Sequence, residues 1–249
     1  MTGFKLFRNN SLALLVVFFG VGAIQAAGEQ PPGQRWEVTL APYVFGASMD
    51  GNMVVRGRQA DVDISSSDIL DNLEFGFMSM AAARKGNWGI AGDVIYIELG
   101  VTSDMPPADV DPTLGILTVQ GLRRLNKFAD LTFGARWSHL DGRIDFKAPI
   151  NVEVEHTKDW VDPVVGVVLK TPGEHRWHAT LIADVGGFGV GSDLTWQIFP
   201  SAGVDMTKHV SLEFGWRILD TKYETGVDRN RFEYDMRLQG PVAGLAFKF

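Results

Sequence analysis

The chain has 249 residues, of which 45% are hydrophobic, and a formal net charge of −7. It contains no cysteine, which excludes disulfides, thiol catalysis, cysteine-based metal sites and a lipid-modified cysteine anchor. The acidic balance also argues against nucleic acid as a partner, because binding to phosphates needs a basic surface.

The first residues have the pattern of a secretory signal peptide. Lys5 and Arg8 give it a positive start, and an apolar stretch runs from Leu12 to Ile24. We expect cleavage among the small residues between Ala26 and Gly28. The alternative is an uncleaved anchor helix, although the apolar stretch is short for a membrane span of about 20 residues.

After the leader, apolar residues alternate with polar ones in about ten segments, which is the pattern of β-strands. The predicted division is a signal peptide over residues 1–27 and one β-barrel domain over residues 28–249. Each segment is long enough for the 9 to 11 residues or so that a tilted strand needs to cross a membrane. In chain order, the predicted strands are Trp36–Ala47, Glu74–Arg84, Trp88–Val101, Thr113–Arg124, Ala129–Leu140, Asp159–Lys170, Arg176–Gly187, Asp193–Met206, Val210–Tyr223 and Phe232–Phe249.

The connections between these segments alternate in length. Mostly long connections follow the odd-numbered strands, with residues 188–192 as a short exception. Tight turns follow the second, fourth, sixth and eighth strands, at residues 85–87, 125–128, 171–175 and 207–209. Short periplasmic turns and long outer loops are typical of bacterial transmembrane barrels. This pattern places both termini on the periplasmic side.

No stretch after the leader approaches the apolar length of a membrane helix, yet the chain is rich in apolar residues, glycine and aromatics. Only helices and closed barrels satisfy their backbone groups within lipid. The sequence therefore predicts an all-β fold, a closed antiparallel up-and-down transmembrane β-barrel of about 10 strands, with 8 or 12 strands as alternatives. A soluble barrel of the lipocalin kind, whose apolar face points inward around a ligand, is the competing architecture.

Charged residues lie on the predicted strand face opposite the apolar one, and we expect that face to line the lumen. The candidates are a salt-bridged plug, a narrow conduit or a catalytic cluster. A barrel of about eight to ten strands has an interior that side chains nearly fill, and buried charges need partners, so a plug is favoured. In a plug, Arg136 and Arg217 would each pair with an acid among Asp93, Asp184 and Glu213. The predicted lumen charge network comprises Asp93, Arg124, Arg136, Asp162, Asp184, Glu213 and Arg217.

Aromatic residues recur at the strand ends that this topology places on the periplasmic side. Such a band is typical of the girdle at a membrane interface, although aromatic residues also favour strands in general. The predicted girdle comprises Trp36, Trp88, Phe128, Trp177, Phe247 and Phe249.

The connection over residues 48–73 begins like a calcium loop at Asp61 and Asp63. Ser66 and Asn72, however, stand where such a loop needs its turn glycine and its closing glutamate, so we predict no metal there.

A structural interpretation of the same connection is a small hairpin made by Met53–Arg56 and Ala60–Ile64. A short helix would follow, capped by Ser66 or Ser67. Its apolar residues Ile69, Leu70 and Leu73 would face one way. We expect this connection to fold over or into the mouth of the barrel.

The histidines are the remaining candidates for chemistry, and none of them predicts a site. Ser138 and His139 are neighbours in one strand and point to opposite faces, so they cannot form a nucleophile and base pair. His175 and His178 lack a third metal ligand, and His156 lies in an acidic outer loop. We therefore predict no catalytic residue, no metal and no cofactor.

The last ten residues, Gly240–Phe249, alternate in the manner of a strand and stop on an aromatic residue. This end resembles that of Gram-negative outer-membrane β-barrels, in which the segment is read by the barrel assembly machinery. The resemblance covers nearly the whole mature chain. It implies a location in the cell outer membrane, contacts with membrane lipid and lipopolysaccharide, and a role for Phe249 as the assembly signal.

The expected function is that of an integral outer-membrane β-barrel with a structural, surface-interaction or small-solute permeation role. The alternative is a barrel enzyme that acts on lipid or peptide at the cell surface. No family of known activity matches the sequence pattern, and no substrate follows from it.

Overall fold

The computed structural model describes residues 35–249, apart from residues 56–57, 105–106, 147–151, 172–175 and 228–230. The predicted signal peptide, residues 1–27, lies outside the described residues. No helix in the described ranges is long and apolar enough to cross a membrane.

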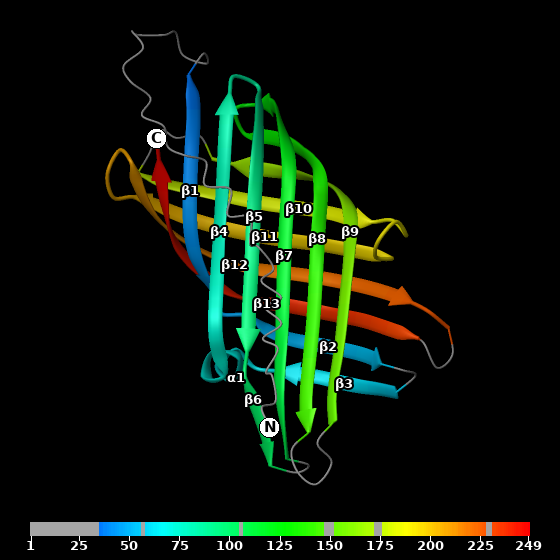
Figure 1. Ribbon diagram of the computed structural model, residues 1–249. Helices are drawn as coiled ribbons and strands as arrows, with labels where there is room; N and C mark the ends of the chain where they lie inside the picture. The colour runs from blue at the N-terminus through cyan, green and yellow to red at the C-terminus, as the bar shows by residue number, and fades with distance from the viewer. Residues whose placement is uncertain (1–34, 56–57, 105–106, 147–151, 172–175, 228–230) are drawn as a thin grey trace, which may run out of the picture.

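Ten antiparallel strands close into a barrel in the described part of the chain (Figure 1). Closure comes from β13, which pairs with β12 on one side and with β1 on the other. The predicted fold class and strand number are thus confirmed. The barrel strands are β1 (Trp36–Phe45), β4 (Leu73–Lys85), β5 (Trp88–Leu99), β7 (Pro107–Asn126), β8 (Ala129–Phe146), β9 (Val152–Lys170), β10 (Trp177–Gly187), β11 (Leu194–Asp205), β12 (Val210–Thr225) and β13 (Phe232–Lys248).

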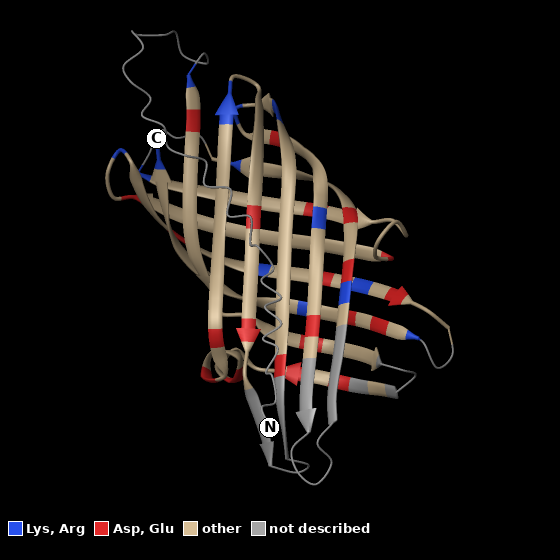
Figure 2. Ribbon diagram, in the orientation of Figure 1, with Lys and Arg blue, Asp and Glu red and all other residues tan. Residues whose placement is uncertain are grey.

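The start of β1 and the end of β13 lie at the same end of the barrel, together with short turns such as the one between β4 and β5 (Figure 1). We call this the periplasmic end and the opposite one the outer end. Figure 2 shows acids and bases near both ends of the strands and few along their middles.

Strands β7, β8 and β9 are longer than predicted, with 20, 18 and 19 residues. Their outer parts were not predicted, because apolar and polar residues alternate only where one face of a strand contacts lipid. Beyond the membrane both faces are wet, and residues such as Asp111 and Pro112 in β7 break the pattern. A short strand, β6 (Val101–Asp104), pairs with the start of β7 there.

The predicted hairpin in the 48–73 connection is present as β2 (Ser48–Val55) and β3 (Arg58–Ile64). Strand β2 continues along the same edge of β13 that β1 occupies nearer the periplasmic end. The hairpin thus prolongs the barrel wall at the outer end.

Helix α1 (Ser66–Asp71) follows the hairpin, and two details of its prediction were wrong. The N-cap is Ser65, which has extended backbone and forms a reciprocal capping box with Asp68. Only Ile69 turns inward and is 6% exposed, whereas Leu70 is 54% exposed. A six-residue helix makes fewer than two turns, so it presents a single position to the barrel, and Leu73 already belongs to β4.

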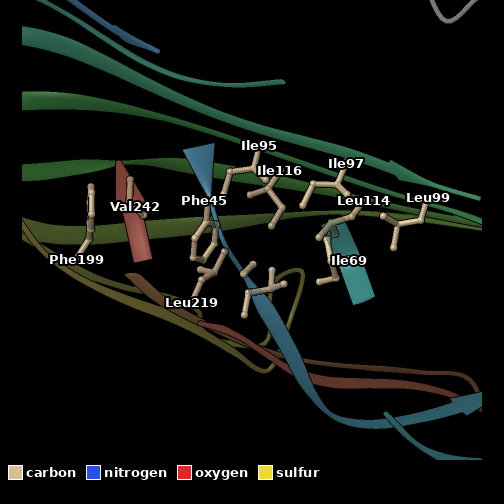
Figure 3. Close-up of a cluster of buried hydrophobic side chains, with 12 residues drawn as sticks. Phe45, Ile69, Ile95, Ile97, Leu99, Leu114, Ile116, Phe199, Leu219 and Val242 are labelled. Atoms are coloured by element: carbon tan, nitrogen blue, oxygen red, sulfur yellow. The ribbon is translucent and has the colours of Figure 1, made fainter. Parts of the chain in front are cut away.

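Buried apolar side chains from several strands pack together inside the barrel (Figure 3). Ile69 of α1 joins this cluster, so the 48–73 connection closes the barrel mouth as expected. A second buried cluster lies beside it, and it comprises Trp160, Phe232, Tyr234 and Met236. The core of this protein is therefore the inside of the barrel, where the two clusters pack among the described residues.

The opposite face of the strands is apolar and exposed. In β8, for example, Leu131 and Phe133 are exposed, while Thr132 and Arg136 between and beyond them are buried. An apolar outer wall is stable in contact with lipid, and a closed barrel leaves no strand edge unpaired there. The lipocalin-like alternative is excluded, because the outer wall of a soluble barrel is polar, whereas the outer wall here is apolar.

Candidate functional site

Arg136, from β8, lies in the middle of the lumen and is 0% exposed. Its Nη2 donates to Asp184 Oδ1 of β10 at 2.7 Å. Its other nitrogens donate to Thr118 at 3.1 Å and to Thr195 at 2.9 Å. All three kinds of guanidinium nitrogen therefore have partners, as a buried cation requires.

Arg217, from β12, is also 0% exposed and sits in a similar setting. Its Nη2 pairs with Asp93 Oδ2 of β5 at 2.5 Å and donates to Gln197 Oε1 at 2.7 Å. Its Nη1 donates to the Tyr43 hydroxyl at 2.9 Å, and that hydroxyl donates to Asp93 Oδ1 at 2.8 Å. Both arginines thus pair with an acid from the expected set.

Gln197 joins the two ion pairs, because its Nε2 donates to the second oxygen of Asp184. The result is one connected set of side chains from strands on opposite sides of the barrel, which we call the central network. Its members are Tyr43, Asp93, Thr118, Arg136, Asp184, Thr195, Gln197 and Arg217.

Asp162 was predicted to be part of the lumen charges, and it has a different role. It is fully buried on β9 and accepts hydrogen bonds from the Ser192 N–H at 2.5 Å and from Trp160 Nε1 at 3.1 Å. It therefore fixes the tight connection between β10 and β11. Asp162 is the register partner of Arg136 across β8 and β9, yet the ion pair of Arg136 goes to Asp184.

Charges form a second group near the periplasmic end. Asp130 Oδ2 pairs with Arg84 Nη2 at 2.5 Å and with Lys170 Nζ at 2.9 Å. Within the described ranges, the ion-pair partner of Arg124 is Glu37, at a loose 4.0 Å. The predicted residue Arg124 thus lies away from the central network.

On the opposite wall, His178 Nε2 lies 2.7 Å from Glu213 Oε1. Gly203 stands between them in the strand register, and a Cβ at this position would overlap both side chains. A side chain at position 203 would push these two side-chain ends aside, so glycine leaves the room that this contact uses. Glu213 is thus bound to a histidine and not to one of the buried arginines.

Sequence reasoning missed Arg84, Lys170 and His178 as members of this group. Lys170 could have been found, because it has the same parity as the inward residue Asp162 on β9. Arg84 has a long side chain that crosses from β4 to Asp130 on β8, and no local pattern predicts such a reach.

A cavity of about 420 Å³ lies between the central network and the periplasmic end. Tyr43 and Asp93 form its inner limit, and Glu37, Arg124 and Lys170 line its periplasmic side. We call this cavity the vestibule. Toward the outer end, by contrast, a small pocket next to Trp160 and Leu238 has a volume of about 10 Å³, room for roughly one water.

The predicted girdle residues are placed at the periplasmic ends of their strands. Trp36, Trp88, Phe128, Trp177 and Phe249 are exposed, and Phe247 is half-buried. The Phe249 N–H donates to Val38 O at 2.9 Å, and Val38 N–H donates back at 3.2 Å. The chain end is therefore paired with β1 up to its last residue.

Ser138 and His139 lie on opposite sides of the barrel wall. Ser138 is buried inside, whereas His139 is outside, stacked on Trp137 and hydrogen-bonded to Asp159 at 2.9 Å. They cannot act as a nucleophile and base. The side chain of His156 and all of His175 lie outside the described residues. In the described ranges, no group of three or more acids and histidines could hold a metal.

Searches against protein-family models and against curated proteins found no match. Solved structures do match. The outer membrane protease OmpT from Escherichia coli has a TM-score of 0.50 and 9% identity, over 90% of this chain and 99% of that one. The attachment invasion locus protein Ail of Yersinia pestis has a TM-score of 0.43 and 10% identity, over 87% of this chain and 99% of that one.

The translocator domain of the autotransporter NalP from Neisseria meningitidis has a TM-score of 0.43 and 11% identity, over 87% of this chain and 89% of that one. The likeness to OmpT concerns the fold alone. It agrees with the closed antiparallel β-barrel described above, and the apolar outer wall is what a barrel in contact with membrane lipid requires.

Proposed function

We propose that this protein is a non-conducting outer-membrane barrel that acts at the cell surface through its outer strands. The observation that supports this proposal is the central network. It places two fully buried arginines and their acids across the middle of the lumen, each held by several hydrogen bonds. A solute could pass only if this set came apart.

The packing toward the outer end supports the same conclusion. Apolar side chains from β1, β5, β7, β12 and β13 meet there, and Ile69 of α1 is inserted among them. Interiors packed in this way contain few voids larger than a water molecule. The small-solute permeation role that the sequence left open is thus less favoured than surface interaction.

The long outer strands are the part that a partner at the surface would meet. A tilted strand crosses the membrane with about 9 to 11 residues, so roughly eight to ten residues of β7, β8 and β9 extend beyond it. At about 3.3 Å per residue, this is roughly 25 to 30 Å of strand. The β2–β3 hairpin and the outer parts of β12 and β13 form a second extension.

Conductance in planar bilayers tests the proposal. The purified protein should give no steady single-channel current, while a porin run in parallel should conduct. Arg237→Ala, which removes an exposed arginine from its pair with Asp220, is the matched control and should also be silent. A large, steady current in the wild-type protein would refute the proposal and make permeation the leading function.

A further inference from the structure

The vestibule has the size and the wall of a small-molecule site. Its volume of about 420 Å³ is far larger than the roughly 10 to 15 Å³ of such space that holds a single water molecule. Ligand sites typically occupy roughly 300 to 1,000 Å³ and combine an apolar wall with a few polar groups. Small or apolar residues make most of this wall, among them Ala41, Ala82, Ala91, Val168, Ile182 and Ala246.

Cations outnumber acids on one side of the vestibule. Along β4, β7 and β9 it is lined by Arg84, Arg124 and Lys170, which share the two acids Asp130 and Glu37. The contact between Arg124 and Glu37 is 4.0 Å long, and the Arg124 side chain is 33% exposed. This leaves Arg124 able to take a better anionic partner.

Unpaired donors line the same side. Gln120 is 7% exposed, and its Nε2 has no hydrogen-bond partner among the described residues. Arg124 Nε and Arg84 Nη1 are likewise buried and unpaired there. Buried polar groups are nearly always hydrogen-bonded to protein or to water, so these three donors favour any acceptor that enters the cavity, whether water or a ligand.

We propose that the vestibule binds a small anionic amphiphile that enters from the periplasmic side. Its charged head would lie near Arg124 and Lys170 and accept hydrogen bonds from the unpaired donors. Its apolar tail would extend along Ala82 and Ala91 toward the central network, where the cavity ends. The ligand therefore leaves by the way it entered. This inference does not depend on the proposed surface role.

The test uses the folded protein in lipid nanodiscs with carbon-13-labelled alanine methyl groups. Octanoate is the amphiphilic probe, acetate supplies the head alone, and octanol supplies the tail alone. Ala82 and Ala91 report on the vestibule, and Ala135 on the lipid-facing wall of β8 reports on probe that merely enters the lipid.

We expect octanoate to shift the Ala82 and Ala91 signals saturably, with acetate and octanol each binding at least tenfold more weakly. The double variant Arg124→Gln/Lys170→Gln should weaken octanoate binding at least tenfold. Lys127→Gln removes a cation at the same end outside the vestibule and should leave binding unchanged. Ala91→Leu should block binding by filling the cavity, without a change in charge.

Four results would overturn the inference. The first is an octanoate shift of Ala135 alone, which would mean lipid partitioning, and the second is octanoate binding to the double variant as tight as to the wild-type protein. Equal binding of octanol would show an apolar site without a charge requirement, and equal binding of acetate would show a site for free anions. Heat-modifiable migration on gels shows that each variant is folded, so a failure to bind is not a failure to fold.

Discussion

Removal of the Arg136 charge should destabilise the barrel strongly. In Arg136→Met, Thr118 and Thr195 lose a donor, and Asp184 keeps only the hydrogen bond from Gln197. Loss of one partner from a buried ion pair costs about 3 to 5 kcal/mol, because the remaining charge stays buried without compensation. We therefore expect a decrease of about this size in the free energy of unfolding.

Urea unfolding in detergent micelles, followed by tryptophan fluorescence, measures this decrease. The control Arg237→Met breaks an exposed Arg–Asp pair of the same chemistry and should cost less than about 1 kcal/mol. The double variant Arg136→Met/Asp184→Leu removes both charges, so it should regain most of the loss.

Two outcomes would refute this reasoning. If Arg136→Met unfolds within about 0.5 kcal/mol of the wild-type protein, which is the range of ordinary surface substitutions, the network does not hold the lumen together. If the double variant is as unstable as the single one, the cost does not come from an uncompensated carboxylate.

Three further predictions concern other parts of the chain. Deletion of Phe249 should lower outer-membrane yield far more than Lys248→Gln, which breaks only a half-exposed pair with Asp205; equal yields on membrane blots would contradict this. Hydrogen bonds from the Ser65 hydroxyl and N–H hold the pKa of Asp68 below its ordinary value of 3.8. The capping contribution of Asp68 is therefore complete above that value and is lost as the pH falls through the lowered pKa. In an NMR titration, Ser65→Ala should raise the pKa of Asp68, and an unchanged value would rule out the capping box. Gly203→Ala should separate His178 from Glu213 and give a histidine NMR spectrum like that of Glu213→Gln; a spectrum like that of the wild-type protein would disprove the close approach.

The wall of the barrel could be predicted from the sequence because its signal is local. Because side chains alternate between the two faces of a strand, the apolar residues at every second position of β8 predict that Phe133 faces lipid and Arg136 faces the lumen. The same signal ended where lipid ends, which is why the outer parts of β7 to β9 were missed. The cap of α1 was predicted one or two residues late, at Ser66 or Ser67, because three consecutive serines, Ser65 to Ser67, all suit the position.

The sequence predicted a group of acids as possible partners of the buried arginines, but not which acid pairs with which arginine. The pairing depends on how the strands are staggered around the closed barrel. Asp162 is opposite Arg136 in the neighbouring strand, but Asp184, one strand further on, receives the ion pair. In the same way, Arg217 reaches Asp93 across the lumen, 124 positions away in the sequence. The vestibule was missed for a related reason, since it depends on the sizes of side chains from strands that are not neighbours.

The proposal of a non-conducting barrel and the proposal of a ligand site in the vestibule concern different parts of the lumen, which are filled to different degrees. If the interior served stability alone, apolar side chains would be expected along its whole length, because burial of apolar area is the main stabilising contribution. Apolar side chains fill only the part from the middle to the outer end, whereas alanines such as Ala82 and Ala91 leave the periplasmic part open. An open path for solutes would need both parts clear. A cavity that ends at a charged network suits binding from one side, so conductance tests the closed part and ligand binding tests the open part.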